Sequence, residues 1–184
     1  MASTGTKATG HLSIWQRSVS TVLARCTAAL SRPSLSSSVR LTRRDGTRVN
    51  SATIGAWGEH LAAQWLRKKN GRKILFRNYR APRGGEVDIV CRHGKVLAFV
   101  EVKTRTSTAF GRPAQAVTLD KQSLIIRGAT AWMRLLGVPD IAWRYDVVEV
   151  LLIPGHKPQV NWIKAAFNTE ELARALAQRR RNRM

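Results

Sequence analysis

The chain has 184 residues, and 32 Lys and Arg against 11 Asp and Glu give it a formal net charge of +21. The length suits one domain with extensions, and 43% hydrophobic residues with six Trp exclude an intrinsically disordered chain. The positive charge favours an anionic partner, either nucleic acid or a membrane surface, with a solubilising surface as the alternative. No apolar run approaches the roughly 20 residues of a membrane span, so we expect no integral membrane association.

Residues 1–50 predict a flexible basic extension that contains an amphipathic helix. The segment is rich in Ser and Arg, has no acid before Asp45, and repeats apolar residues at helical intervals between Leu12 and Leu30. Pro33 and the Ser cluster around it predict a linker. Taken alone, such an acid-poor, Arg-rich start favours an organelle transit peptide, and a basic extension of a bacterial protein is the alternative.

Residues 51–168 predict one α/β domain. Apolar residues at helical spacing predict a first helix, capped by Ser51 or Thr53 and ended by the Gly of KKNG. RKILFRNYR predicts an edge strand, and EVDIVCRHGKVLAFVEVKTR predicts a hairpin. Because VLAFVEV is apolar on both faces, we expect it to be the central strand.

The second half of the domain predicts further elements. A helix runs from about Leu124 to Gly137, IAWRYDVVEVLLI predicts a strand, and VNWIKAAF predicts a short strand or turn. Residues 169–184 predict a basic C-terminal helix or tail. The order α-β-β-β-α-β indicates a central mixed β-sheet flanked by helices.

The hairpin places acids in register. If the dipeptide HG forms the turn, Asp88 pairs with Phe99 and Glu86 pairs with Glu101. Asp88 and Glu101 are then diagonal neighbours on one face, about 7 Å apart. Lys103 points to the same face because side chains alternate along a strand. A slip of one residue would send Asp88 to the other face, so the predicted site depends on this register.

Two neighbouring carboxylates predict a cation site. They repel each other, and Mg²⁺ compensates this repulsion with one or two carboxylates, water and substrate phosphate as ligands. Such an ion polarises a phosphodiester, and Lys103 can position the attacking water or stabilise the charge of the transition state. The alternative is an ordinary surface ion pair between Glu101 and Lys103. The two Cys and four His show no spacing typical of a metal site.

Four blocks of sequence carry a family resemblance. GAWGEHLAAQWL, RNYRAPRGGEVDIVCRHGKVLAFVEVKTR, FGRPAQAV and WRYDVVEV follow one another in this order. Together they resemble the YraN-like family of uncharacterised bacterial proteins, which is similar to Holliday-junction resolvases and restriction-endonuclease-like nucleases of the PD-(D/E)-x-K superfamily. The resemblance covers roughly residues 54–167 and implies a restriction-endonuclease-like core. Val87 departs from the superfamily pattern, which has Pro at this position.

The resemblance implies roles for individual residues. Asp88 stands at the metal-binding Asp, Glu101 at the second acidic ligand and Lys103 at the catalytic lysine. Glu59, in the first predicted helix, matches a helical Glu that many relatives add to the metal site; a solvent-facing charge is its alternative. Gln115 falls where resolvase-like members often place a polar residue, and it replaces an acid found in some relatives. The implied ion is Mg²⁺ or Mn²⁺.

These features lead to three hypotheses. The first is a metal-dependent nuclease acting on DNA, including branched or repair intermediates. The second is a non-catalytic nucleic-acid-binding module of the same fold, with DNA favoured over RNA, and the third is a binder of anionic surfaces through the two basic tails. The residues expected to contact nucleic acid are Arg80, Arg83, Arg105, Arg112 and Gln115.

The resemblance also bears on location and assembly. Because the relatives are bacterial, it favours a cytoplasmic bacterial protein over one targeted to an organelle through the N-terminal extension. Resolvase-like relatives often work as dimers, since a symmetric junction presents two strands to cut, so a homodimer is the arrangement expected by analogy.

Overall fold

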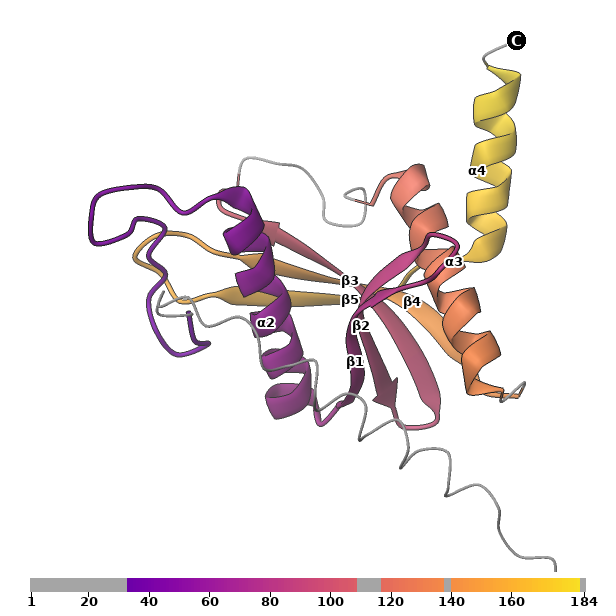
Figure 1. The fold of residues 1–184 in the computed structure, drawn as a ribbon, viewed down its shortest axis with the longest axis horizontal. Coiled ribbons are helices and arrows are strands. Elements are labelled where there is room, and N and C mark those ends of the chain that lie inside the picture. Colours follow the sequence, from indigo (N-terminus) through magenta and orange to yellow (C-terminus); the bar gives the residue numbers. More distant parts are fainter. Residues whose placement is uncertain (1–32, 109–116, 138–139, 183–184) are drawn as a thin grey trace, which may run out of the picture. The chain divides into compact units, whose positions relative to one another are not determined.

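The computed structural model describes residues 33–108, 117–137 and 140–182. It contains a five-stranded sheet in the order β1-β2-β3-β4-β5 (Figure 1). Strands β3 and β4 are parallel, and the other neighbours are antiparallel. The strands are β1 (Lys73–Arg80), β2 (Glu86–His93), β3 (Val96–Arg105), β4 (Trp143–Leu151) and β5 (Gln159–Phe167). The helices are α2 (Ser51–Asn70), α3 (Leu119–Leu136) and α4 (Thr169–Arg181).

This arrangement confirms the predicted fold class. The sheet is mixed, helices flank it, and β3 is its central strand, as the two-sided apolar pattern of VLAFVEV indicates. The architecture is compatible with a restriction-endonuclease-like core. VNWIKAAF, which the sequence leaves open between strand and turn, forms most of β5.

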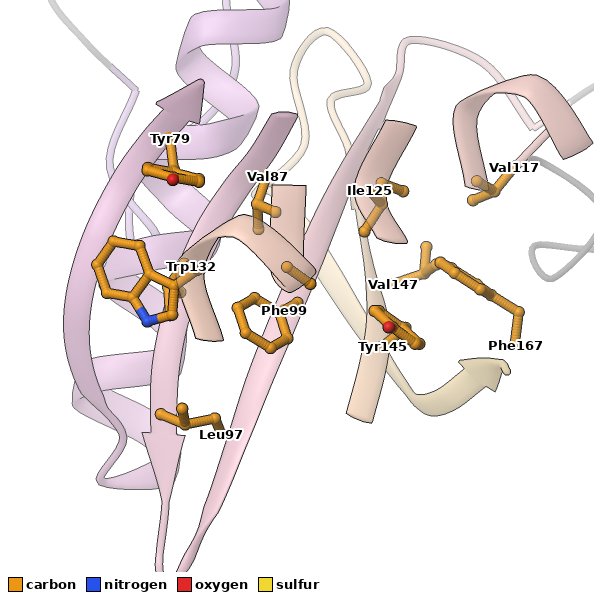
Figure 2. Close-up of a cluster of buried hydrophobic side chains, with 12 residues drawn as sticks. Tyr79, Val87, Leu97, Phe99, Val117, Ile125, Trp132, Tyr145, Val147 and Phe167 are labelled. Atoms are coloured by element: carbon orange, nitrogen blue, oxygen red, sulfur yellow. The ribbon is translucent and has the colours of Figure 1, made fainter. Parts of the chain in front are cut away.

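One face of the sheet holds the main hydrophobic core, which α3 covers (Figure 2). Phe99 of β3 and Tyr145 of β4 pack with ring centroids 6.3 Å apart. Trp132 of α3 packs edge-on against Tyr79 of β1, with centroids 5.1 Å apart. The buried members of this core are Tyr79, Val87, Val90, Leu97, Phe99, Val117, Ile125, Ala129, Trp132, Tyr145, Val147 and Phe167.

Helix α2 covers the opposite face. Gly58 approaches β3 so closely that an added Cβ would lie 1.8 Å from Thr104 Oγ1. Thr104 is an odd number of residues from Phe99, so its side chain lies on the face away from the main core. On the same side, Trp65 of α2 packs edge-on against Trp162 of β5, with centroids 6.4 Å apart. The two helices therefore enclose the sheet from both sides.

The ends of α2 follow from local chemistry. The Oδ1 of Asn50 accepts a hydrogen bond from Thr53 N at 2.8 Å, so Asn50 caps the helix. The predicted cap at Ser51 or Thr53 is therefore wrong, and the cap is the residue just before Ser51. Asn binds exposed N–H groups at helix starts as readily as Ser does. At the other end Gly71 adopts a φ of 59°, which confirms the predicted glycine stop.

The hairpin register differs from the predicted one. His93 pairs with Val96, so Gly94 and Lys95 form the turn, and Phe99 pairs with Val90 rather than with Asp88. Gly94 takes the positive φ, 62°, at the first central position, where a type II′ turn requires glycine. The predicted pairs were therefore displaced by two residues. Because side chains alternate with period two, an even displacement keeps Glu101 and Lys103 of β3 on the face that they share in the predicted register.

Some described residues outside the predicted 51–168 domain also pack in the fold. Val39 is buried and pairs with Pro154, and its N–H donates to His156 O at 2.8 Å. The predicted N-terminal amphipathic helix lies outside the described residues. Within the described ranges, no helix has the length and apolar character needed to cross a membrane.

Helix α4, predicted as a separate basic tail, packs on the same unit. Leu172 is buried, and Arg179 Nη1 lies 3.1 Å from Oδ1 of Asp120 at the start of α3. Asn168 caps the helix by accepting from Glu171 N at 2.8 Å. The acids in its first turn and the arginines in its last turn each lie at the end of the helix dipole that attracts them, so both stabilise the helix.

Candidate functional site

Strands β2 and β3 separate at the position of the acids. Going from the turn towards the start of β2, the last backbone pair is Ile89 with Val100. One residue further along each strand are Asp88 and Glu101, which the observed register brings directly opposite each other rather than diagonal. Here Oδ2 of Asp88 accepts a hydrogen bond from Val102 N at 2.8 Å, so a carboxylate takes the place of a strand carbonyl. The carboxyl group of Asp88 is thereby held between the two strands.

The surroundings of Asp88 disfavour its charge. Burial and the nearby charge of Glu101 raise the pKa of Asp88 from its ordinary value of 3.8 to about 7. The backbone N–H of Val102 and the charge of Lys121 act in the opposite direction, and the charge of Glu59 adds a smaller rise. The carboxyls of Asp88 and Glu101 therefore lie close enough for their like charges to interact unfavourably.

Glu101 is buried and faces two lysines. Its side chain is 3% exposed, with Lys103 Nζ 2.8 Å from Oε1 and Lys121 Nζ 3.3 Å from Oε2. The contact with Lys121 is close enough for an ion pair but lacks hydrogen-bond geometry, so the buried Oε2 has no hydrogen-bond partner. A carboxylate oxygen in this state retains a lone pair for a further ligand.

Lys121, which sequence analysis missed, joins α3 to the acids. Its ammonium forms ion pairs with Glu86 and Glu101. Burial alone would lower the pKa of Lys121, but the hydrogen bond to Glu86 and the charges of Glu101 and Asp88 outweigh it and raise that pKa. A signal was present in the sequence, because a lysine in the first turn of a helix opposes the helix dipole and needs a compensating anion.

Two glycines position Lys121 against β2. An added Cβ on Gly85 would lie 2.6 Å from Gly128 N, and one on Gly128 would lie 3.0 Å from Glu86 N. Gly85 also has a φ of 117°, which L side chains rarely adopt. This backbone contact places α3 beside the start of β2, so that Lys121 of the helix reaches Glu86 of the strand.

Glu86 acts as a bridge between cations. Its Oε2 lies 2.6 Å from Arg80 Nη1, and its Oε1 pairs with Lys121. The hydrogen bond from Lys121, followed by the charges of Lys121 and Arg80, holds the pKa of Glu86 below its ordinary value despite partial burial. Glu86 therefore holds the lysine that faces Glu101, although it does not face Asp88 itself.

Glu59 reaches the site from the other face. It lies on α2 next to Gly58, whose close approach to Thr104 brings the helix against β3. Its charge contributes to the raised pKa of Asp88. The structure thus brings Glu59 into the electrostatic environment of Asp88, and its role as a metal ligand stays a prediction.

The predicted nucleic-acid contacts have different surroundings. Arg80 is 78% exposed and pairs with Glu86, while Arg83 is exposed in the loop before β2. Arg105 Nε lies 3.7 Å from Oε1 of Glu149. The remaining two predicted residues, Arg112 and Gln115, lie outside the described residues.

The carboxylates fit a divalent cation as a two-ligand site. Across residues 33–108, 117–137 and 140–182, no group of three or more His, Cys, Asp or Glu residues is arranged to hold a metal ion. Asp88 and Glu101 alone satisfy Mg²⁺ or Mn²⁺ only when water and phosphate oxygens complete the coordination shell. The repulsion felt by Asp88 and the unbonded Oε2 of Glu101 are the two features that such an ion relieves.

The fold and site together define a class of protein: an α/β protein with a mixed sheet that gathers two carboxylates and two lysines where β2 and β3 separate. The family model described as "Uncharacterised protein family UPF0102" matches residues 58–150, and the chain belongs to this family. This match spans the acids, Lys103 and Lys121. It confirms the bacterial family expected from the sequence blocks.

Individual bacterial relatives agree with the family match. The chain is 46% identical over 114 residues to a UPF0102 protein of Nocardia farcinica, covering 62% of this chain and 88% of the relative. It is 45% identical over 114 residues to one of Geobacter sulfurreducens, with the same coverage of 62% and 88%. It is 47% identical over 116 residues to one of Trichlorobacter lovleyi, covering 62% and 90%.

Proposed function

We propose that the protein is a metal-dependent nuclease that hydrolyses phosphodiester bonds in DNA. The observation that carries the proposal is the convergence of Asp88 and Glu101, two mutually repelling carboxylates, beside the ammonium of Lys103. The chain has only 11 Asp and Glu against a net charge of +21, and two of these acids meet where β2 and β3 separate. The same positive charge suits a polyanionic substrate.

The residues have distinct tasks in this proposal. Asp88 and Glu101 hold Mg²⁺ or Mn²⁺, which when bound supplies Lewis-acid polarisation of the phosphodiester and a more acidic water. Lys103, held 2.8 Å from Glu101, presents an ammonium that orients the attacking water or balances charge in the transition state. Lys121 stays protonated near neutral pH because its pKa is raised, so it acts as a fixed cation and not as a base.

The substrate side of the proposal rests on positive residues near these acids. Arg80 and Arg83 lie in and after β1, close to Glu86, and Arg105 ends β3 two residues beyond Lys103. Contacts from such side chains to backbone phosphates position DNA without reading its bases. The proposal therefore includes a DNA backbone substrate and no base specificity.

The test is a cleavage assay with purified protein. Labelled duplex, flap and four-way-junction DNA are incubated with Mg²⁺, Mn²⁺, Ca²⁺ or EDTA, using wild type, Glu101→Gln and Lys103→Gln. We expect cleavage of at least one substrate with Mg²⁺ or Mn²⁺ and a loss of about 100-fold or more in each variant, as for removal of groups that stabilise transition-state charge.

Matched controls make the assay specific. Glu170→Gln changes an exposed acid on α4, and Lys95→Gln changes an exposed lysine in the hairpin turn at the far end of β2 and β3. Both controls should cut at the wild-type rate when DNA is saturating. Cleavage that survives in Glu101→Gln and Lys103→Gln would assign the activity to a contaminant and refute the site.

A non-catalytic nucleic-acid-binding module is the second candidate, and one observation favours it. Both oxygens of Glu101 already face lysines, Lys103 and Lys121, so the site is neutralised without a metal. The same assay separates the two functions. Tight DNA binding that is unchanged in EDTA, with no cleavage of any substrate by wild type, would identify the module.

A further inference from the structure

A second cluster of charged and aromatic residues surrounds Trp162 on the α2 face of the sheet. Three cationic groups lie over the indole: Arg72 Cζ at 5.1 Å from the ring centroid, Arg144 Cζ at 5.6 Å and Lys164 Nζ at 4.7 Å. The ring of His93 packs against the same indole, with centroids 5.6 Å apart. We call these five residues the Trp162 cluster.

A buried carboxylate fixes the centre of this cluster. Asp146 is fully buried and accepts from Trp162 Nε1 at 3.0 Å, from Arg144 Nε at 2.8 Å and from Ala165 N at 2.9 Å. Arg144 Nη2 also lies 2.9 Å from Nδ1 of His93. Both oxygens of Asp146 are therefore used to hold the indole, one guanidinium and the backbone of β5 in place.

The cluster has more positive charge than this carboxylate balances. Among the described residues, no Asp or Glu forms an ion pair with Arg72 or Lys164, and the buried Nε of Arg72 has no hydrogen-bond partner. Burial, and then the charges of Arg72, Arg144 and Lys164, lower the pKa of His93. The ring of His93 therefore favours its neutral form, and three cations surround one indole ring whose Nε1 donates to a single carboxylate.

Packing alone does not require this excess. The ion pair of Arg144 with Asp146 already satisfies the buried acid, and a neutral side chain at the exposed position 164 would avoid the repulsion between like charges. Convergent cations of this kind lose their mutual repulsion when an anion binds between them. Guanidinium groups match the oxygens of phosphate especially well.

We propose that Arg72, Arg144 and Lys164 form a phosphate-binding site, in which Trp162 and Asp146 hold the cations in position and the phosphate belongs to a nucleic-acid backbone. The site is separate from the carboxylate site. His93 ends β2 and Asp88 is the third residue of the same strand, so the two lie about 16 Å apart at 3.3 Å per residue. The phosphate-binding site therefore contacts nucleic acid at a distance from Asp88 and Glu101, and its binding does not depend on hydrolysis there.

The test measures DNA binding without cleavage. Fluorescence anisotropy with labelled single-stranded and duplex oligonucleotides in EDTA gives the dissociation constant at a series of salt concentrations. We expect Arg72→Gln and Lys164→Gln each to reduce the slope of log K against log salt by about 1, and the double variant to reduce it by about 2. Because EDTA prevents metal-dependent cutting, failure of the proposed nuclease function leaves this result intact.

A matched control and a second ligand complete the experiment. Arg134→Gln removes an exposed arginine from α3, on the other face of the sheet, and should leave the slope unchanged. Lys164 is exposed, so its variant keeps the fold, and circular dichroism checks both variants. In parallel, inorganic phosphate and pyrophosphate are tested for their effect on the melting temperature of wild type and the double variant.

The outcomes separate the sources of the phosphate. Reduced salt slopes in the cluster variants but not in Arg134→Gln support a nucleic-acid phosphate. Unchanged slopes with stabilisation of wild type alone by inorganic phosphate support the same site with a free phosphate as its ligand. Slopes equal to those of the control, together with no difference in stabilisation by phosphate, overturn the proposal.

Discussion

Lys121 at the start of α3 lies 3.3 Å from Oε2 of Glu101 in β3 and also pairs with Glu86 at the start of β2. One ammonium thus connects a helix to two strands through two carboxylates. Its side chain is only 21% exposed, so water screens these interactions weakly. Lys121 is therefore a structural part of the site as well as a neighbour of the proposed catalytic groups.

Replacing Lys121 with Met should destabilise the protein. The change keeps most of the side-chain volume but leaves Glu86 and the buried Glu101 with one cation fewer, and we expect a loss of about 1–3 kcal/mol in the free energy of unfolding. Urea unfolding at pH 8 measures it. The control Lys157→Met lies at an exposed loop position and should change the stability by less than about 0.5 kcal/mol.

A double-mutant cycle shows whether this loss comes from Glu101. Adding Glu101→Gln removes the charge that Lys121 faces, so the two changes together should cost less than the sum of their separate costs. Strict additivity of the two free-energy changes would contradict the contact between Lys121 and Glu101.

The pKa of Asp88 predicts how stability depends on pH. Its folded pKa of about 7 lies above the ordinary 3.8 of the unfolded chain, so the folded protein binds this proton more tightly. Stability from this group is present at acid pH and is lost as pH rises between these values, by up to about 1.4 kcal/mol per pH unit. Asp88→Asn removes this loss while its amide oxygen still accepts from Val102 N.

Urea unfolding in EDTA from about pH 4 to about pH 8 measures this loss of stability, because the range spans the unfolded and folded pKa values of Asp88. The free energy of unfolding of Asp88→Asn minus that of wild type should increase steadily across this range, so that the variant is the more stable protein at high pH. Groups that do not interact with Asp88 titrate in the same way in both proteins and cancel in the difference. Curves that run parallel would show that Asp88 titrates near its ordinary pKa.

Because α2 packs closely on β3, we expect alanine to change the stability of the protein in opposite directions at two glycines of α2. Gly58→Ala places a Cβ 1.8 Å from Thr104 Oγ1, and the resulting shift should cost about 1–2 kcal/mol net of the better helix propensity of alanine. Gly55→Ala meets nothing within 4 Å and should stabilise by about 0.5–1 kcal/mol.

Thermal unfolding of both variants checks this contrast. The two substitutions are chemically identical and lie one helical turn apart, so helix propensity is shared and only the contact with Thr104 differs. A stabilised Gly58→Ala would show that α2 does not approach β3 as closely as described. Because Gly58 precedes Glu59, the same variant should also weaken the effect of Glu59 on Asp88.

The sequence predicts much of the fold because local patterns encode it. The two-sided apolar run of β3, the glycine that ends α2 and the alternation along β2 all depend on residues close in the chain. Alternation also explains why Asp88, Glu101 and Lys103 share a predicted face, even though the turn lies one residue further along and the strand pairs are displaced by two. Side-chain period two tolerates an even error in register and fails only for an odd one.

The parts that the sequence does not predict depend on contacts between distant elements. Lys121 reaches Glu86 and Glu101 only because Gly85 and Gly128 allow the backbones of β2 and α3 to meet. The sequence around any one of these residues does not predict that the others lie next to it in space. The Trp162 cluster has the same origin, since its members come from β2, β4, β5 and the turn between α2 and β1.

Metal binding should compete with protons at the carboxylates. Asp88 must lose its proton to bind Mg²⁺ or Mn²⁺, so the rise in melting temperature caused by a given Mn²⁺ concentration should be larger at pH 8 than at pH 6, on either side of a pKa of about 7. Differential scanning fluorimetry with Mn²⁺ and EDTA measures the shift. Asp88→Asn and Glu101→Gln should abolish it, whereas Glu170→Gln, on exposed α4, should retain it. An equal shift in all four proteins would place the bound ion elsewhere and remove the basis for a metal at Asp88 and Glu101.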